Sequence, residues 1–324
     1  MLLRLWPEKT EVSFMRMRFM ALIVSVALLI GAGAFLSLKG LNLGIDFAGG
    51  SVIEIVKPDG KTSDDVRSAV APLNLGDVSI NSARGTGENA VDLIIVRFET
   101  QTPKPGEDLE SAQQNATDNV VEVLSAAFGD DFELRSKASV GPKVSGELFR
   151  SGIIALSVAL LLMMVYISFR FQWQYALGAV MALFHDVFIT MGVFALTGFE
   201  FNLATIAALL TIVGYSMNDT VIVFDRVREE VRKYKKMELG KVVDLAINAT
   251  MSRTLLTSGT TLLALLSIFI FGGAVLRGMS FALIFGVIIG TYSSIFVASS
   301  VVLALGIDRG DKPKREVEGF QGVG

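Results

Sequence analysis

Long apolar stretches, separated by polar segments, dominate the hydrophobicity pattern of this chain. Six of them are long enough to span a membrane, because about 20 apolar residues in a helix cross the hydrocarbon core of a bilayer. They lie at about residues 19–38, 151–169, 174–198, 201–225, 254–272 and 279–305. Lipid cannot satisfy exposed main-chain polar groups, so each stretch is expected to be helical. The pattern therefore predicts a polytopic α-helical membrane protein.

The polar segment between the first two spans, residues 39–148, alternates between strand-like and helix-like patterns. Runs of β-branched residues or of alternating polarity predict strands at residues 51–56, 78–80, 91–98 and 132–134. Amphipathic patterns predict helices at residues 63–73 and 109–128. The resulting order, β-α-β-β-α-β, predicts a small α+β domain of the ferredoxin-like type. This scaffold hosts many activities and does not define one.

Basic residues gather at alternate ends of the spans. Because Lys and Arg beside a span favour the cytoplasmic side, they predict cytoplasmic termini and a periplasmic insert. The basic groups are Arg4, Lys9, Arg16 and Arg18; Arg170; Arg226, Arg228, Arg232, Lys233, Lys235, Lys236 and Lys241; and Arg309, Lys312, Lys314 and Arg315. The predicted parts are the N-terminus with the first span (1–38), the periplasmic domain (39–148), spans two to four (149–225), a cytoplasmic amphipathic helix along the membrane face (226–252), the last two spans (253–305) and a cytoplasmic tail (306–324).

Composition narrows the class of protein. Hydrophobic residues make up 52% of the 324 residues, which is too many for an ordinary soluble enzyme. A formal net charge of −3 gives no reason to expect nucleic-acid binding, and a chain without Cys has no disulfide or thiolate metal site. The single histidine excludes a multi-histidine metal site. No phosphate-binding loop or zinc-protease motif occurs, so we expect no enzymatic activity, no cofactor and no metal.

An acidic residue inside the fourth span is the strongest functional candidate. Asp219 lies about two-thirds of the way along it, with Tyr215, Asn218 and Thr220 nearby and Asp225 at its cytoplasmic end. A charge at the bilayer centre costs at least about 2.5–3.5 kcal/mol, so this carboxylate is expected to face protein or water. Burial disfavours the charged form and a nearby cation favours it, so a carboxyl there can exchange protons near neutral pH.

Arg253, at the start of the fifth span, is the cation expected to act on Asp219. It is expected to hold the carboxylate ionised in one conformation and to release it for protonation in another. The alternative is a buried structural ion pair that fixes the register of two helices. Spacing in the sequence leaves both interpretations open.

His185 and Asp186 form a second polar pair, about halfway across the third span. Imidazole titrates near physiological pH, so the pair is a candidate for a secondary proton network together with Tyr215, Asn218 and Asp225. Adjacent residues on a helix point about 100° apart, so the two side chains need not share a partner. A histidine satisfied by a neighbouring helix is the alternative, and Asp186 is the better candidate of the two.

Five motifs together resemble the SecD/SecF family of protein-export membrane proteins, and within it the SecF branch. They are LNLGIDFAGG at 41–50, VGPKVSGEL at 140–148, GYSMNDTVIVFDRVREE at 214–230, SRTLLTSGTTLL at 252–263 and GTYSSIFVASSVV at 290–302. The similarity covers nearly the whole chain in the expected order. Ala48 stands where the family pattern has Thr, which is a mild departure.

The resemblance implies a fold of the resistance-nodulation-division (RND) type, in which this six-helix half pairs with a related half supplied by SecD. It also implies work with the SecYEG channel after SecA has started the preprotein across the bacterial inner membrane, with the proton-motive force driving completion. YajC is a further partner that the family suggests. The family assigns proton coupling to Asp219 and Arg253, and His185 and Asp186 occupy its intramembrane His-Asp position.

We therefore expect protonation of Asp219 to shift the helix bundle and to swing the outer domain against emerging substrate. One proton moved through 100 mV supplies about 2.3 kcal/mol, enough to bias a two-state motion more than tenfold. The expected hinge comprises Gly44, Asp46, Gly49 and Gly50, although the last two glycines equally suit a simple turn.

Two rival functions are a proton-driven RND-type exporter of lipids or drugs and an assembly subunit without proton coupling. A lipid or drug exporter favours a large apolar cleft in the outer domain, which the modest insert argues against. Under the assembly hypothesis, Asp219→Asn is silent.

Overall fold

Six helices of the described residues are long and apolar enough to cross a membrane, which confirms the predicted fold class. The computed structural model describes residues 10–83, 91–103 and 105–307, apart from the side chains of residues 274 and 275. The spans are α1 (Arg18–Leu38), α5 (Pro142–Arg170), α6 (Trp173–Thr197), α7 (Leu203–Lys233) and α8 (Leu239–Phe271), and then α9 (Gly273–Ser293), a π-helical turn (Ser294–Ala298) and α10 (Ser299–Leu305), which together form the sixth. A short 3₁₀ turn, η1 (Phe14–Arg16), precedes α1.

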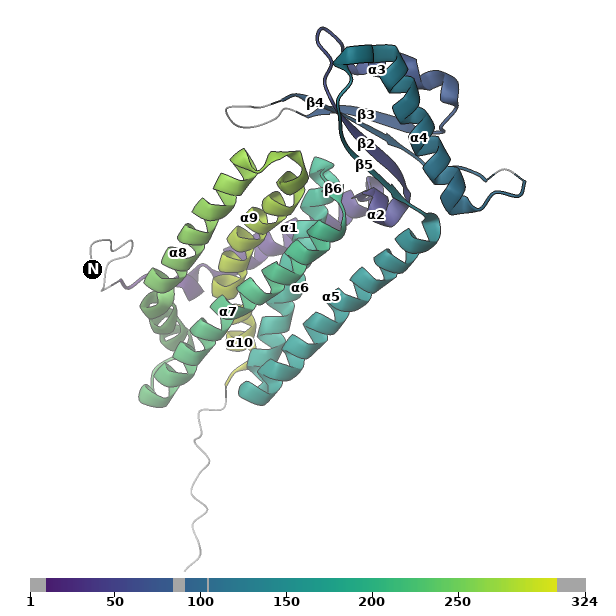
Figure 1. Cartoon of the computed structure of the whole chain (residues 1–324). Helices are drawn as coiled ribbons and strands as arrows, with labels where there is room; N and C mark the ends of the chain where they lie inside the picture. Colours follow the sequence, from purple (N-terminus) through teal and green to yellow (C-terminus); the bar gives the residue numbers. More distant parts are fainter. Residues whose placement is uncertain (1–9, 84–90, 104, 308–324) are drawn as a thin grey trace, which may run out of the picture.

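The centre of the bundle is formed by α6, α7 and the α9–α10 helix, whose side chains are mostly buried (Figure 1). Aromatic side chains lock α6 against α7, and the rings of Tyr175 and Phe224 meet edge to face with centroids 4.9 Å apart. The outer helices α1 and α5 instead expose large apolar side chains such as Ile23, Ile30 and Leu162. Such side chains suit contact with lipid tails.

The insert after α1 folds into the predicted β-α-β-β-α-β domain, which lies at one end of the bundle (Figure 1). Its antiparallel sheet has the strand order β3-β4-β2-β5, so β3 and β5 are the edges. The two helices cover one face of the sheet. The elements are β2 (Gly50–Val56), α3 (Ser63–Val70), η2 (Ala71–Leu73), β3 (Val78–Ala83), β4 (Leu93–Phe98), α4 (Leu109–Phe128), η3 (Gly129–Asp131) and β5 (Leu134–Val140).

Local sequence explains where these elements begin and what they bury. Thr62 and Asp65 form a reciprocal capping box at the start of α3, and the Asp108 carboxylate accepts a hydrogen bond from the main-chain N–H of Ser111 (2.8 Å) at the start of α4. Between sheet and helices, Ile53 and Leu124 are fully buried. Each such side chain stabilises the domain by roughly 1.5–3 kcal/mol, so the insert has a core of its own.

Three short elements connect the outer domain to the bundle. After α1, β1 (Asn42–Leu43) pairs in parallel with β6 (Glu200–Phe201), which lies between α6 and α7. The single-turn helix α2 (Ile45–Ala48) follows, and Gly49 and Gly50 then lead directly into β2 with φ angles of +75° and +108°. The chain therefore enters the central strand of the sheet straight from the membrane surface.

The structure differs from the sequence prediction at three places. The last strand, predicted at residues 132–134, is β5 at Leu134–Val140 and so begins where the predicted strand ends. No separate amphipathic helix spans residues 226–252: its first part continues α7 to Lys233, and the rest belongs to α8, which runs unbroken from Leu239 into the fifth span. Of its apolar positions, Val242 and Ala246 are buried against the bundle, whereas Tyr234 and Leu245 are exposed. Helix α5 begins at Pro142, well before the apolar run, because proline suits the first turn of a helix.

Several basic residues of the topology prediction lie outside the described residues: Arg4, Lys9, Arg309, Lys312, Lys314 and Arg315.

Candidate functional site within the membrane

Asp219 is completely buried in the bundle, yet it lacks a partner among the residues that the structure describes. Its side chain is 0% exposed, and neither carboxylate oxygen has a hydrogen bond among the residues that the structure describes. The positive charge that acts on it is that of Arg253, but the two side chains make no direct ion pair, and Arg253 itself is exposed. A buried carboxylate without donors is costly in its charged form. The geometry therefore does not support the alternative of a tight structural ion pair.

A line of hydroxyl groups crosses from α7 to α9 beside Asp219. The Tyr215 hydroxyl donates to the Ser258 Oγ on α8 (3.3 Å), and Ser258 shares a hydrogen bond with Thr291 on α9 (2.9 Å). The Thr254 hydroxyl, next to Arg253 in the chain, is buried without a partner among the described residues. These groups can exchange a hydrogen bond with a neighbouring carboxyl when helices shift.

Asp186 has the opposite environment. One oxygen is 3.0 Å from His185 Nδ1, and the other accepts hydrogen bonds from the hydroxyls of Ser216 on α7 (2.6 Å) and Ser293 on α9 (2.7 Å). His185 Nε2 is buried and unpaired within the described part of the chain, which fits a neutral ring that carries its proton on Nδ1. Asp186 therefore joins three helices, and both of its oxygens have hydrogen-bond partners, as buried polar groups usually do.

The other predicted network residues are not brought together. Asn218 lies exposed on α7, and Asp225 forms ion pairs with Arg170 (3.0 Å) and Arg228 (3.6 Å) at the end of the bundle away from the outer domain. Sequence reasoning did not single out Ser216, Ser258 or Ser293. The available signals were that Ser216 lies three residues before Asp219 and that Ser258 and Ser293 lie in polar runs. These signals are weak, because a serine in a membrane helix often bonds only its own backbone.

Exposed stripes of small and polar residues run along α7 and α8. Residues three or four apart share one face of a helix, and the exposed residues of these two faces are small or polar except for Leu256, although other faces of α8 expose large apolar side chains such as Leu263 and Phe271. We call them the α7 stripe (Ala207, Thr211, Gly214 and Asn218) and the α8 stripe (Arg253, Leu256, Thr260, Ala264 and Ser267). Such composition is typical of helix–helix contact and not of contact with lipid.

Two of the four predicted hinge residues, Gly44 and Asp46, lie where the outer domain meets the start of α7, whereas Gly49 and Gly50 lie at the start of β2. The Asp46 carboxylate accepts a hydrogen bond from the main-chain N–H of Leu203, the first residue of α7 (3.0 Å). Arg97 of β4 forms a close ion pair with Glu200 of β6. The Gly44 N–H donates to the Phe201 carbonyl (2.9 Å). Three contacts thus tie this region to β6 and to the first residue of α7, the helix that carries Asp219.

A six-helix bundle with an α+β domain inserted after the first helix, and a carboxylate buried within it, defines a class of membrane transport proteins. The chain belongs to the SecD/SecF family: a family model described as "Protein export membrane protein SecD/SecF, C-terminal" matches residues 120–308, and the SecD/SecF GG motif matches residues 34–56. Membership and the six apolar helices make it a multi-pass protein of the bacterial inner membrane.

Individual relatives agree with this family. Protein translocase subunit SecF of Rhodobacter capsulatus is 44% identical over 322 residues, which are 98% of this chain and 96% of the relative. Protein translocase subunit SecDF of Brucella abortus is 39% identical, and the match covers 97% of this chain but 40% of that longer one. The crystal structure of SecDF, a translocon-associated membrane protein from Thermus thermophilus, matches with a TM-score of 0.77 and 31% identity, over 93% of this chain and 39% of that one.

Proposed function

We propose that the protein is a subunit of the Sec protein-export machinery that, with SecD, uses the proton-motive force to complete preprotein translocation after SecA and SecYEG have started it. The observation that carries the proposal is the buried carboxylate of Asp219, which has no hydrogen-bond donor among the described residues. Such a group favours the protonated form in this conformation and the ionised form in one that brings Arg253 or water to it. Proton binding and release then accompany a change of conformation.

SecD is the proposed partner because relatives carry both parts in one chain, of which this chain matches about two-fifths. The α7 and α8 stripes suit such a partner, because close helix packing in lipid depends on small and polar side chains.

The contacts of Asp46, Gly44 and Arg97 provide the proposed route from proton to work. A shift of α7 moves Leu203 and Glu200, and both are bonded to the outer domain. In this proposal the termini are cytoplasmic and the outer domain is periplasmic, where a polypeptide emerges from the channel. One proton per 100 mV contributes about 2.3 kcal/mol to that motion.

Asp186 is proposed as an anchor for the packing of α6, α7 and α9, and not as the coupling group. Its three donors hold one protonation state, and a change there would leave buried hydroxyls unpaired at about 1–3 kcal/mol each.

A lipid or drug exporter is less well supported, because the cavities found in the outer domain are shallow and lined by many polar residues.

The decisive experiment is gradient-dependent release of a secreted protein from spheroplasts whose only copy of this subunit is Asp219→Asn. The gradient-dependent part of the release is expected to fall at least about tenfold, because a proton that no longer binds supplies none of its roughly 2.3 kcal/mol per 100 mV. Asp225→Asn is the matched control, since it makes the same chemical change at an exposed ion pair of the same helix. Equal release by both variants, at equal membrane levels and with SecD bound, would exclude Asp219 as the coupling group.

A further inference from the structure

We infer that the β3 edge of the outer domain binds an extended segment of the translocating polypeptide as a fifth strand of the sheet. The inference rests on the proposed export function and names the surface that meets the substrate. In the described residues β3 pairs only with β4, so its other side is an open edge. An open edge binds extended chains through main-chain hydrogen bonds.

The direction of the main-chain groups on β3 follows from its neighbours. The Lys57 N–H donates to the Asp92 carbonyl (2.8 Å), and main-chain groups of an antiparallel strand alternate between its two sides. Phe98, six residues beyond Asp92, therefore bonds toward β2, and a Cβ on Gly50 would indeed collide with its carbonyl oxygen.

Phe98 stands opposite Val78 in the β3–β4 register. Because Phe98 bonds toward β2, the N–H and C=O of Val78 point away from β4, and by alternation so do those of Ile80 and Ser82. Arg67 supplies an independent check, since its guanidinium reaches the Val78 carbonyl from α3 (3.4 Å). Three residues of β3 therefore present main-chain groups to an incoming strand.

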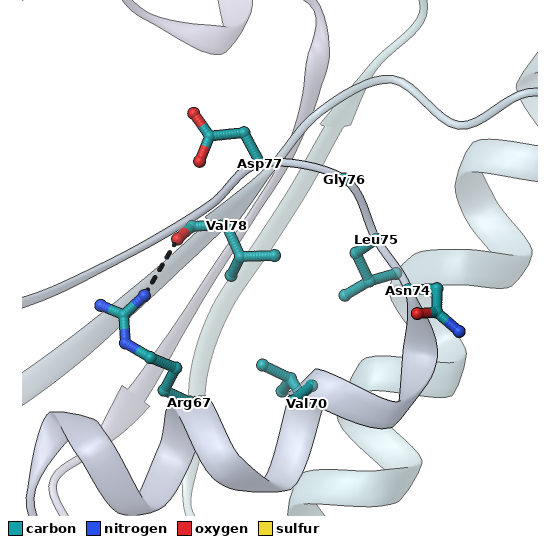
Figure 2. Close-up of a pocket in the computed structure, with 8 residues that line it drawn as sticks. Arg67, Val70, Asn74, Leu75, Gly76, Asp77 and Val78 are labelled. Atoms are coloured by element: carbon teal, nitrogen blue, oxygen red, sulfur yellow. Dashed lines mark hydrogen bonds between the residues drawn. The ribbon is translucent and has the colours of Figure 1, made fainter.

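A hollow between α3 and the start of β3 lies beside this edge (Figure 2). Its floor is apolar, formed by Val70, Leu75 and Val78, of which the first two are buried. Side chains of a paired strand point alternately to the two faces, so the hollow would receive an apolar side chain from it. Arg67 and Asp77 on the rim carry opposite charges and thus select neither sign.

These features fit a mobile, unfolded polypeptide better than a permanent partner. Main-chain pairing is indifferent to sequence, which suits a surface that meets many exported proteins. Three outward residues and one hollow offer far less than the roughly 1,000 Å² that a stable protein interface buries. Binding is therefore weak, and the segment can move on.

The opposite edge, β5, is also open in the described residues but carries charged side chains. It carries Arg135 and Lys137, and Lys137 is paired with Asp118 of α4 (2.8 Å). Charged side chains, lysine above all, discourage strand addition at an edge. The sequence of β3, VSINSA, has no charged residue and no proline.

The test is photocrosslinking in membranes that hold this subunit, SecD and an export substrate arrested partway across. p-Benzoylphenylalanine replacing Asp77 is expected to crosslink to the substrate, whereas the same group replacing Asp131, which precedes the opposite edge strand, is not. Ser82→Pro removes an outward N–H, a change that edge strands tolerate, and should lower the crosslink about fivefold, the loss expected for one main-chain hydrogen bond. Ser82→Ala is the matched control, because both variants lose the Ser63–Ser82 hydroxyl contact (2.8 Å) and only proline loses the N–H.

A second comparison leaves this chain unchanged and alters the substrate. An arrested segment of alternating Val and Thr should crosslink about fivefold more than one with Pro at every second residue, which cannot complete a ladder. Equal crosslinks for the two segments, or a crosslink to SecD or to a second copy in place of the substrate, would overturn the inference. The crosslink needs no gradient, so it should survive Asp219→Asn. If the crosslink is absent although gradient-dependent release requires Asp219, the inference about the β3 edge is wrong and the proposed function stands. If the crosslink is present although Asp219→Asn does not change release, the proposed proton coupling is wrong and the inference about the β3 edge stands.

Discussion

At the scale of single residues, the two intramembrane aspartates have opposite environments. Asp186 receives hydrogen bonds from three side chains on three helices, whereas Asp219 receives none from the described residues. The sequence predicted that both positions matter, because an acidic residue inside an apolar run is costly. It could not assign their roles, since the donors to Asp186 are serines that come from other helices.

Gly50 is required by its backbone conformation and by the lack of room for a side chain. Its φ is +108°, and a Cβ there would strike the Phe98 carbonyl, so Gly50→Ala should destabilise the outer domain by about 1–3 kcal/mol or more. Gly60→Ala is the control, because Gly60 also has a positive φ (+69°) but nothing within 4 Å of an added Cβ. Limited proteolysis of the purified full chain across a urea series measures the difference. Equal protection of the two variants would mean that the contact with Phe98 adds nothing to the strain.

At the scale of elements, the order of helices and strands was predictable and their junctions were not. The length of the apolar stretches located the six spans, and periodicity located the β-α-β-β-α-β insert, because each element contains its own signal. The β1–β6 pair has only two residues a strand and joins segments far apart in the chain, so no local pattern announces it. Likewise, the many charged residues at 226–252 predicted a helix on the membrane surface. The structure places most of this segment in α7 and α8, where residues such as Val242 and Ala246 pack into the core of the bundle.

The Asp46 contact at the start of α7 leads to a prediction about coupling between elements. Asp46→Ala removes the acceptor for the Leu203 N–H, at a cost of about 0.5–2 kcal/mol, and should weaken gradient-dependent release although Asp219 is intact. Asp108→Ala removes a comparable cap at α4, within the outer domain and away from the link, and is the matched control. The spheroplast assay compares them. A larger defect in Asp108→Ala would show that loss of a cap, and not of the link, limits release.

At the scale of the whole molecule, the bundle is asymmetric in what it presents to the membrane. The helices α1, α5 and much of α8 expose large apolar side chains, whereas the α7 stripe exposes small and polar ones. A protein complete in itself would face lipid with similar surfaces all round. The asymmetry supports assembly with a second half, as in the longer SecDF relatives.

Gly214, in the middle of the α7 stripe, tests this view of assembly. An added Cβ meets nothing within 4 Å, so Gly214→Phe should leave the isolated chain folded. It should nevertheless weaken copurification with SecD at least about tenfold, because a large side chain keeps two helices apart. Gly31→Phe on α1 is the control, since nothing lies within 4 Å of that position either. Unchanged copurification of Gly214→Phe would place the partner on another face.

Helix α7 is unbroken from Leu203 to Lys233, so a tilt of the helix moves its two ends by different distances. At about 1.5 Å per residue its 31 residues form a rod of roughly 46 Å. A tilt of about 10° around one end of such a rod displaces the other end by about 8 Å, more than the spacing of two strands. In a tilt about the Lys233 end, Asp219 lies about 21 Å from the pivot and moves by about 4 Å, so the displacement where the outer domain is attached is about twice that at the carboxylate.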